Sequence, residues 1–453
     1  MFARTDYPSF LLKYQSQDNG GDRAPCFYDC QLVCMLKAAM KVLCIPYTHA
    51  LSHVSRPLAV AVELRRRGHE IVFAGEGNKL SFVQQDGFQT LPLFEPDPRV
   101  LYDNIRQRRL RFVSDADIDL MLEADLELYS KTKPDLVLTD GRFTAPISCH
   151  IASVKHAAIV NASSTEFRAL PYVPLFDRLP EMILPRDSKS WKNMDRLNLY
   201  LEMLVFNQAM KTFAALSKKY KLSRKITATN CLAGKDLTLL PDVPEYFPTR
   251  NLPSSYHYIG PLTLQQPRPL PAWWTAAIKQ KKKIIYLTMG TTGLSAFFER
   301  AVNYLKDINA IVIITTGGLA GISMPLPDHI YAEDYLDGDA VMAAASLVIC
   351  HGGNGTIYQA LKMGKPVIGI PTIPDQDFNM RQVVRLGAGI TVTSESYARD
   401  ATTLLAAIDT VLTSKEYTAN ARLLQNKIET YNAPVAAADL MEKLMSDKEF
   451  HHV

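Results

Sequence analysis

The stretch CHGGNGTIYQALKMGKPVIGIPTIPDQDFN, residues 350–379, decides the expected fold. The apolar run SLVIC leads into it and predicts a buried strand. HGGNGT then turns directly into the helix IYQALKMG, and PVIGIPT predicts a second strand. Strand, helix and strand in this order form a unit whose two strands run parallel. The stretch therefore predicts a parallel sheet that is covered by helices.

The same alternation extends through most of the chain. KVLCIPY predicts a first strand, and a helix from about Val54 to Arg67 should end at Gly68. Its buried side is expected to hold Val54, Leu58, Ala61, Val62 and Leu64. Further predicted strands are EIVFAG, DLVLTD, AAIVNAS, KIIYLTMG, AIVIITTGG, HIYAEDYL and GITVT. We therefore expect an α/β protein with two doubly wound, Rossmann-like domains.

The proline-rich segment GPLTLQQPRPLPAWW, residues 260–274, reads as a stiff linker between the two domains. It divides the chain into an N-terminal domain of residues 40–262 and a C-terminal domain of residues 263–453. Residues 1–39 are polar and turn-rich, so we expect a poorly ordered extension or a wrongly chosen start codon.

Composition narrows the function class. The 453 residues are 47% hydrophobic, and the net charge of +4 comes from 50 basic and 46 acidic residues mixed along the chain. Such an even balance argues against a nucleic-acid partner. No apolar run is long enough for a transmembrane segment, so the basic runs RQRRLR and KQKKK allow at most peripheral membrane contact. Cys44, Cys149 and Cys350 lie in or beside apolar segments, which predicts free buried thiols and a cytoplasmic location.

The turn HGGNGT has the character of an anion site. Its glycines allow close approach to the backbone, and the free amides of Asn354 to Thr356 at a helix N-terminus favour a phosphate or diphosphate. Thr356 adds a hydroxyl and His351 a donor. The alternative is a glycine turn that serves only tight packing between strand and helix. Asp375, Gln376 and Asn379 follow the next strand and suit sugar hydroxyls, so the two clusters together indicate a nucleotide sugar.

These motifs resemble a known family. HGGNGT…ALKMGKPVIGIP…DQ…N is similar to the donor-binding signature of inverting glycosyltransferases of the family 1 type, which include bacterial natural-product glycosyltransferases and adopt the GT-B fold. SHVSRPLAVAVELRRRGHEIVFAG is similar to the family's opening segment, and TMGTTG to the first loop of its C-terminal domain. Ser52 and the pair Arg56–Pro57 depart from the family pattern, as does Tyr335, where many relatives have tryptophan.

The resemblance assigns roles to residues. It implies that His53 is the catalytic base and that Asp140 is its orienting carboxylate. The residues that it implies for the donor are Thr291, Thr292, Tyr335, His351, Gly353, Asn354, Gly355, Thr356, Asp375 and Gln376. No metal or cofactor is expected, because helix amides can carry the charge of the leaving group and the nucleotide sugar is a substrate.

We therefore expect a hexose to move from a UDP- or dTDP-sugar to a hydroxyl of an apolar small molecule or lipid. The Leu-, Met- and Phe-rich segment 167–213 favours such an acceptor. His49 is a rival base, His53 could instead cap a helix, and Asp140 could cap the segment that follows it. A nucleotide-sugar 2-epimerase and a non-catalytic nucleotide-sugar-binding protein are the alternative functions. DGD, residues 337–339, resembles a metal motif, but we interpret Asp339 as an N-cap.

Overall fold

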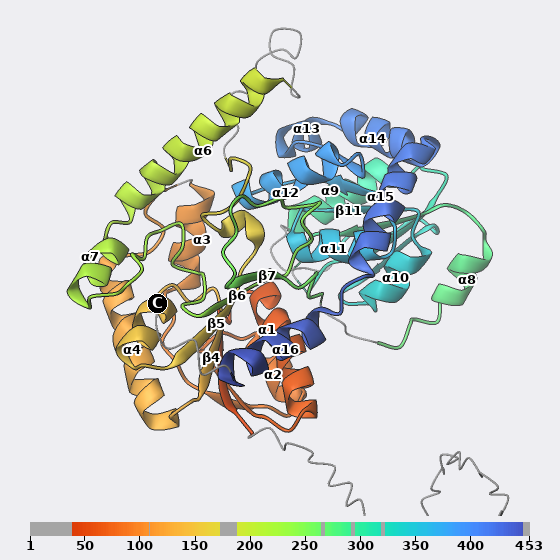
Figure 1. Cartoon of the computed structure of the whole chain (residues 1–453). Coiled ribbons are helices and arrows are strands. Elements are labelled where there is room, and N and C mark those ends of the chain that lie inside the picture. The colour runs from red at the N-terminus through yellow and green to blue at the C-terminus, as the bar shows by residue number, and fades with distance from the viewer. Residues whose placement is uncertain are drawn as a thin grey trace, which may run out of the picture. The chain divides into compact units, whose positions relative to one another are not determined.

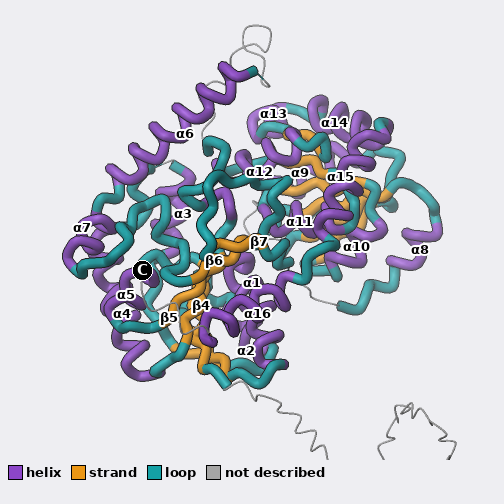
Figure 2. The backbone as a smooth tube through the Cα atoms, viewed as in Figure 1, coloured by secondary structure: helices purple, strands orange, loops and turns teal. Residues whose placement is uncertain are grey.

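The structure is a computed structural model that describes residues 39–107, 109–172, 188–263, 268–290, 295–318 and 322–446. Within these ranges the strands form two parallel sheets, each flanked by helices (Figures 1 and 2). The doubly wound α/β class predicted from the sequence is confirmed. The predicted extension, apart from residue 39, lies outside the described residues, as do linker residues 264–267. The predicted domain boundaries remain predictions.

Among the described residues the first sheet has seven strands and the second has six. In spatial order the first sheet consists of β3 (Gln89–Leu91), β2 (Glu70–Ala74), β1 (Lys41–Pro46), β4 (Leu136–Asp140), β5 (Lys155–Ile159), β6 (Leu237–Leu240) and β7 (Tyr256–Tyr258). The second consists of β10 (Ile330–Glu333), β9 (Ile311–Thr315), β8 (Ile284–Thr288), β11 (Leu347–Cys350), β12 (Val367–Gly369) and β13 (Gly389–Thr391).

The helices connect these strands. Those of the first half are α1 (Leu51–Arg66), α2 (Leu80–Gln85), α3 (Pro98–Arg106), α4 (Asp115–Thr132), α5 (Ala145–Ile151), α6 (Lys189–Ala209) and α7 (Thr212–Lys219). Those of the second half are α8 (Trp274–Lys279), α9 (Ser295–Leu305), α10 (Gly338–Ala344), α11 (Asn354–Lys362), α12 (Pro374–Arg385), α13 (Ser394–Arg399), α14 (Thr402–Thr413), α15 (Lys415–Ile428) and α16 (Ala433–Ser446).

Each sheet reverses its strand order once. From β1 the chain goes to β2 on one side and later to β4 on the other, and from β8 it goes to β9 and later to β11. At these reversals Pro46 pairs with Asp140, and Cys350 pairs with Thr288. Ligands of open parallel sheets bind at the carboxyl ends of the strands at such points. The fold thus provides two candidate positions for a site.

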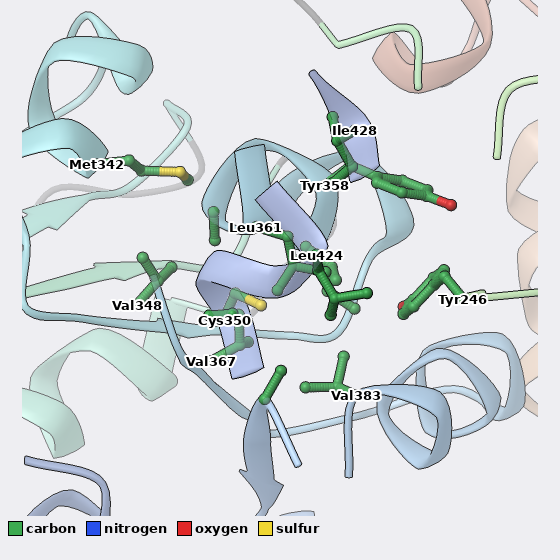
Figure 3. Packing of buried hydrophobic residues seen from close by; sticks show 14 of the residues in the cluster. Tyr246, Met342, Val348, Cys350, Tyr358, Leu361, Val367, Val383, Leu424 and Ile428 are labelled. Atoms are coloured by element: carbon green, nitrogen blue, oxygen red, sulfur yellow. The ribbon is translucent and has the colours of Figure 1, made fainter. Parts of the chain in front are cut away.

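Both faces of the second sheet are buried, as β11 shows. Leu347 and Ile349 join the core on one face, whereas Val348 and Cys350 join the core on the other. Figure 3 shows part of the latter core, where Val348 and Cys350 lie near Leu361 and Leu424. Successive side chains of a strand point to opposite faces of the sheet, and both faces are buried here. The sequence of such a parallel strand is therefore continuously apolar.

The prediction of free, buried thiols is confirmed. Cys44, Cys149 and Cys350, and also Cys231, are free and buried. Burial raises the pKa of the Cys350 thiol to about 12 and acts in the same direction on the others, because a thiolate is poorly solvated in an apolar core. These thiols are therefore protonated packing groups.

Helix α1 follows its prediction with two corrections. It begins at Leu51, before the expected Val54, and Gly68 ends it with a positive φ of 91°. Val54, Leu58, Ala61 and Leu64 are buried as predicted, but Val62 is 42% exposed. The position after it, Glu63, faces inward instead, because Arg66 and Arg67 donate to its carboxylate.

Three short strands were not anticipated. Strands β3, β6 and β7 have only three or four residues each, which is too short for a clear periodic pattern. Helix α16 packs on α1, where Ala437 and Met441 share a core with Val54 and Leu58. The end of the chain thus contributes to the core of the first sheet.

Candidate active site

The first polar cluster lies at the carboxyl end of the first sheet, beside the β1–β4 pair. His53 is in the first turn of α1, and Asp140 is the last residue of β4. Nδ1 of His53 lies 2.5 Å from Oδ1 of Asp140. Because a carboxylate only accepts hydrogen bonds, this contact fixes the proton on Nδ1 and leaves the lone pair on Nε2. The pair has the geometry of a base and its orienting carboxylate.

The environments of the two residues differ. Asp140 is buried, whereas the side chain of His53 is 35% exposed, so the imidazole remains open to a substrate. Neither residue acts as a cap: the N-cap of α1 is Ala50, and the Asp140 carboxylate is occupied by side chains. The capping alternatives for His53 and Asp140 are therefore not supported by the geometry.

Arg56, one turn after His53, holds the same carboxylate. Its Nε donates to Oδ2 of Asp140 at 2.7 Å, and Nη2 donates to Oδ1 at 2.6 Å. Nη1 donates to Oδ1 of Asn161, which follows β5 closely. Arg56 is buried, so this bidentate ion pair is shielded from water. The Asp140 charge is thus shared between the imidazole and a fixed guanidinium.

His49 has different partners. Its Nε2 lies 3.9 Å from Oε2 of Glu95, and Oε1 of Glu95 accepts from the backbone amide of Thr48 at 2.8 Å. The Tyr47 ring is near both histidines, with its centroid 5.5 Å from that of His49 and 6.0 Å from that of His53. His49 therefore lacks the close carboxylate contact that orients His53.

A small recess adjoins the His53–Asp140 pair. It is lined by residues that include Tyr47, Glu95, Met121, Gly141, Arg142 and Phe143. Gly141 has a positive φ of 93°, and a Cβ there would come within 3.0 Å of Tyr47 and 3.5 Å of Nδ1 of His53. The glycine thus keeps the space beside the imidazole free. The sequence analysis missed these residues, although Tyr47 and Gly141 directly follow the strands β1 and β4.

The second polar cluster lies at the corresponding point of the second sheet. His351 follows β11 and is buried, and its Nδ1 has no hydrogen-bond partner among the described residues. Burial lowers the pKa of His351 to about 4, since the interior disfavours the charged imidazolium. A Cβ at Gly290 or Gly353 would meet the ring at 2.8 or 2.5 Å. The ring is therefore a neutral group enclosed by glycines.

Helix α11 begins at this turn, with Gly353 as its N-cap. The first amide that bonds back within the helix is that of Ile357, so those of Asn354, Gly355 and Thr356 precede the ladder. A Cβ at Gly355 would meet nothing within 4 Å, which shows open space beside the turn. The geometry agrees with the predicted anion site.

Asp242, after β6, joins the first half of the chain to this turn. Its Oδ1 accepts from Asn354 Nδ2 at 3.2 Å and from the Tyr358 hydroxyl at 3.0 Å, and its Oδ2 accepts from the Ala162 amide at 2.7 Å. Burial raises the pKa of Asp242, while these hydrogen bonds lower it. Asn354 Oδ1 is buried and unpartnered among the described residues. No sequence pattern marked Asp242.

Asp375 lies at the start of α12, next to the glycine turn. Its carboxylate accepts from the Tyr172 hydroxyl at 3.3 Å and from Asn379 Nδ2 at 3.3 Å, and the same Nδ2 donates to the Gly352 carbonyl at 3.0 Å. Burial raises the pKa of Asp375, whereas the hydrogen bonds from Tyr172 and Asn379 and the positive charge of Arg56 lower it. The carboxylate is therefore coupled electrostatically to Arg56 of the first cluster.

Gln376 is placed differently from its predicted role. Its Oε1 accepts from the amide and the hydroxyl of Thr372, at 2.8 and 2.9 Å. The side chain is buried, so its oxygen organises the loop before α12 and only the Nε2 group is left for a sugar.

Of the remaining predicted donor residues the structure describes Tyr335, which lies at the edge of the second sheet. Tyr335 follows β10, is exposed, and donates to the Gly317 carbonyl at 2.7 Å. The Arg268 guanidinium lies 5.3 Å from its ring centroid. Thr291 and Thr292 lie outside the described residues.

The interpretation of DGD needs a correction. Asp337, not Asp339, is the N-cap of α10, because its side chain accepts from the amide of Ala340. Asp339 accepts instead from Nε2 of Gln359 at 2.6 Å. The described residues contain no group of three or more His, Cys, Asp or Glu side chains that could hold a metal. A membrane-spanning candidate is also lacking among the described helices, because none joins sufficient length to sufficient apolar character.

Comparison with known proteins adds independent information. Residues 299–444 match the family model "Erythromycin biosynthesis protein CIII-like, C-terminal domain". The chain is 30% identical over 391 residues to a PGL/p-HBAD biosynthesis glycosyltransferase of Mycobacterium tuberculosis, covering 85% of this chain and 87% of that protein. It is 30% identical over 361 residues to a PGL/p-HBAD biosynthesis rhamnosyltransferase of Mycobacterium bovis, covering 78% of this chain and 77% of the relative.

Solved structures agree on the fold. The calicheamicin glycosyltransferase CalG4 matches with a TM-score of 0.67 at 19% identity, over 91% of this chain and 100% of that one. The spinosyn rhamnosyltransferase SpnG in complex with spinosyn aglycone matches with a TM-score of 0.66 at 19% identity, over 89% and 100%. These likenesses confirm the GT-B fold. The chain is a glycosyltransferase and belongs to the bacterial natural-product glycosyltransferases of the family 1 type.

Proposed function

We propose that the enzyme is an inverting glycosyltransferase that transfers a hexose from a nucleoside diphosphate sugar to a hydroxyl of an apolar acceptor. The observation that carries this proposal is the contact of 2.5 Å between His53 and the buried Asp140, with the imidazole still 35% exposed. A hydroxyl becomes a good nucleophile only when a base takes its proton. Nε2 of His53 takes that proton, and Asp140 stabilises the resulting imidazolium through Nδ1–H.

The transfer itself forms one bond and breaks another. The acceptor oxygen bonds to the anomeric carbon on the face opposite the leaving group, and the bond from that carbon to the diphosphate oxygen breaks through an oxocarbenium-like transition state. The electron pair leaves with the nucleoside diphosphate. The free amides of α11, the hydroxyl of Thr356 and the neutral His351 stabilise its charge. No step requires a metal or a cofactor in this mechanism.

Asp375 contacts the sugar in this proposal. Its carboxylate is held by Tyr172 and Asn379, which leaves further lone pairs for sugar hydroxyls. Gln376 Nε2, Tyr335, Thr291 and Thr292 complete the donor site as the family resemblance implies. We favour a dTDP-sugar, because the related structure of VinC is a complex with dTDP and that of SpnG is known with thymidine diphosphate.

The spinosyn aglycone bound to the related SpnG supports an apolar acceptor. The four buried free thiols suit a reducing compartment, and we place the enzyme in the cytoplasm. The comparisons do not favour the 2-epimerase alternative.

A transfer assay tests the proposal. The purified chain is incubated with dTDP- and UDP-hexoses and a p-alkylphenol, and nucleoside diphosphate release and product mass are followed. We expect release that depends on the acceptor, and a product whose anomeric proton coupling shows inversion. Retention of configuration would contradict the mechanism, and release of nucleotide without any glycoside would contradict the transfer.

A further inference from the structure

Helix α6 turns an apolar face towards solvent. Leu197, Tyr200, Leu201, Leu204 and Val205 are between 45% and 60% exposed. Their spacing of three and four residues places them on one side of the helix. Figure 1 shows α6 as a long helix that continues into the shorter α7. Large apolar side chains gathered in this way on a surface mark a binding face more often than chance exposure does.

The inner side of the same helix is more polar than its outer side. Its buried residues include Asn198 and Glu202 beside Trp191 and Leu199. Glu202 forms a buried ion pair with Arg168. A helix of an ordinary globular surface has the opposite distribution, with the apolar stripe towards the core. The arrangement therefore indicates that the outer stripe of α6 has an external partner.

The charges around the stripe identify the partner's chemistry. Within this fully described helix the exposed charged side chains are Lys189, Lys192 and Arg196, and all are positive. The two acidic residues are less accessible, because Asp195 is only partly exposed and Glu202 is buried against Arg168. An apolar stripe bordered by lysine and arginine suits a surface that is apolar in depth and anionic at its boundary.

We propose that α6 docks the enzyme on the surface of an anionic lipid bilayer. The stripe from Leu197 to Val205 enters the boundary between headgroups and acyl chains, and the basic residues contact anionic headgroups. This contact is peripheral. It differs from the basic runs RQRRLR and KQKKK considered in the sequence, since α6 carries both an exposed apolar stripe and exposed basic residues along one helix.

Vesicle co-sedimentation with the full chain tests the docking. We expect binding to vesicles of equimolar phosphatidylglycerol and phosphatidylcholine, weaker binding at raised salt, and little binding to phosphatidylcholine alone. The double variant L201E/L204E should lower the partition coefficient about ten-fold or more, since it removes two inserted side chains and adds negative charge. The matched control is Leu423→Glu on α15, whose leucine is 63% exposed, and it should bind like the wild type.

Both variants change exposed residues, so equal melting temperatures check that the fold is intact. Equal vesicle binding by the double variant and the wild type would overturn the docking. A concentration-dependent dimer in sedimentation velocity that L201E/L204E abolishes, without vesicle binding, would also overturn it and would identify a protein interface. The docking is measured without donor or acceptor, so its outcome does not depend on the proposed function.

Discussion

The two switch points of this molecule hold their histidines differently. At the first, Asp140 contacts His53, and Arg56 and Asn161 complete a connected set of hydrogen bonds, while the neighbouring Tyr47 hydroxyl is buried without a partner among the described residues. At the second, His351 Nδ1 is buried without such a partner, and open space adjoins the turn at Gly355. Buried polar atoms that lack partners cost free energy unless a ligand binds them. The contrast indicates that His53 is organised for proton transfer and that the turn after β11 is organised for binding an anion.

The largest effect is expected from the removal of the base. His53→Ala should lower kcat about 10³-fold, because the acceptor proton then has no positioned acceptor. Product formation with saturating donor and acceptor measures it. His49→Ala is the matched control, and it should stay within about three-fold of the wild type since His49 has no close carboxylate. Equal losses in the two variants would refute the assignment of the base.

Removal of Arg56 breaks the hydrogen-bonded set that connects His53, Asp140 and Asn161. Arg56→Met leaves the buried Asp140 carboxylate with His53 alone, and we expect the free energy of unfolding to fall by about 3 kcal/mol. Urea unfolding at neutral pH measures it, with Arg66→Met on the same helix as an exposed control. A free energy of unfolding within about 0.5 kcal/mol of the wild type would contradict the role of Arg56 as partner of the buried carboxylate.

The free energy of unfolding should fall in acid, partly because His351 is buried in its neutral form. The pKa of His351 is about 4 in the folded protein against the ordinary histidine value of 6.5, so the unfolded chain takes up a proton first as pH falls. The associated stability is present above pH 6.5 and is lost as pH falls towards 4. Its size is about 3.5 kcal/mol at most, from about 2.5 pKa units at about 1.4 kcal/mol each. His156 shifts in the same direction, to about 3, because it is buried.

A comparison of variants separates the two histidines. His351→Gln cannot titrate, so it should lose less stability between pH 7 and pH 4.5 than the wild type, as measured by urea unfolding at both pH values. Bound dTDP should reduce the difference if it uses the His351 ring. If His351→Gln loses as much stability between the two pH values as the wild type does, the whole effect belongs to His156 and other groups.

The smallest effect is expected at Asp242, which joins the two halves through Asn354. Asp242→Asn keeps the size but weakens the hydrogen bonds from Asn354 and Tyr358. We expect the KM for the donor to rise about five-fold with little change in kcat, because the base is untouched. Initial rates at varied donor concentration measure it. A fall in kcat alone would mean that Asp242 acts on the His53–Asp140 pair.

Sequence reasoning located both polar clusters because each lies at the carboxyl end of a recognisable strand. LVLTD ends at Asp140 and SLVIC ends before His351, so the carboxyl ends could be read directly. It could not show that Arg56 reaches Asp140 across 84 positions, or that Asp242 meets Asn354 across 112, since such contacts depend on strand order and not on local pattern. The short strands β6 and β7, which place Asp242, carried too few residues for periodicity.

The central claim is that His53 serves the chemical step and His351 serves donor binding. Its most direct test is dTDP binding measured by calorimetry. The central claim predicts that His53→Ala binds dTDP like the wild type while its turnover is lost, and that His351→Ala binds about ten-fold more weakly or worse. Unchanged dTDP affinity in His351→Ala, together with lost affinity in His53→Ala, would contradict the account, because the anion would then bind at the first sheet.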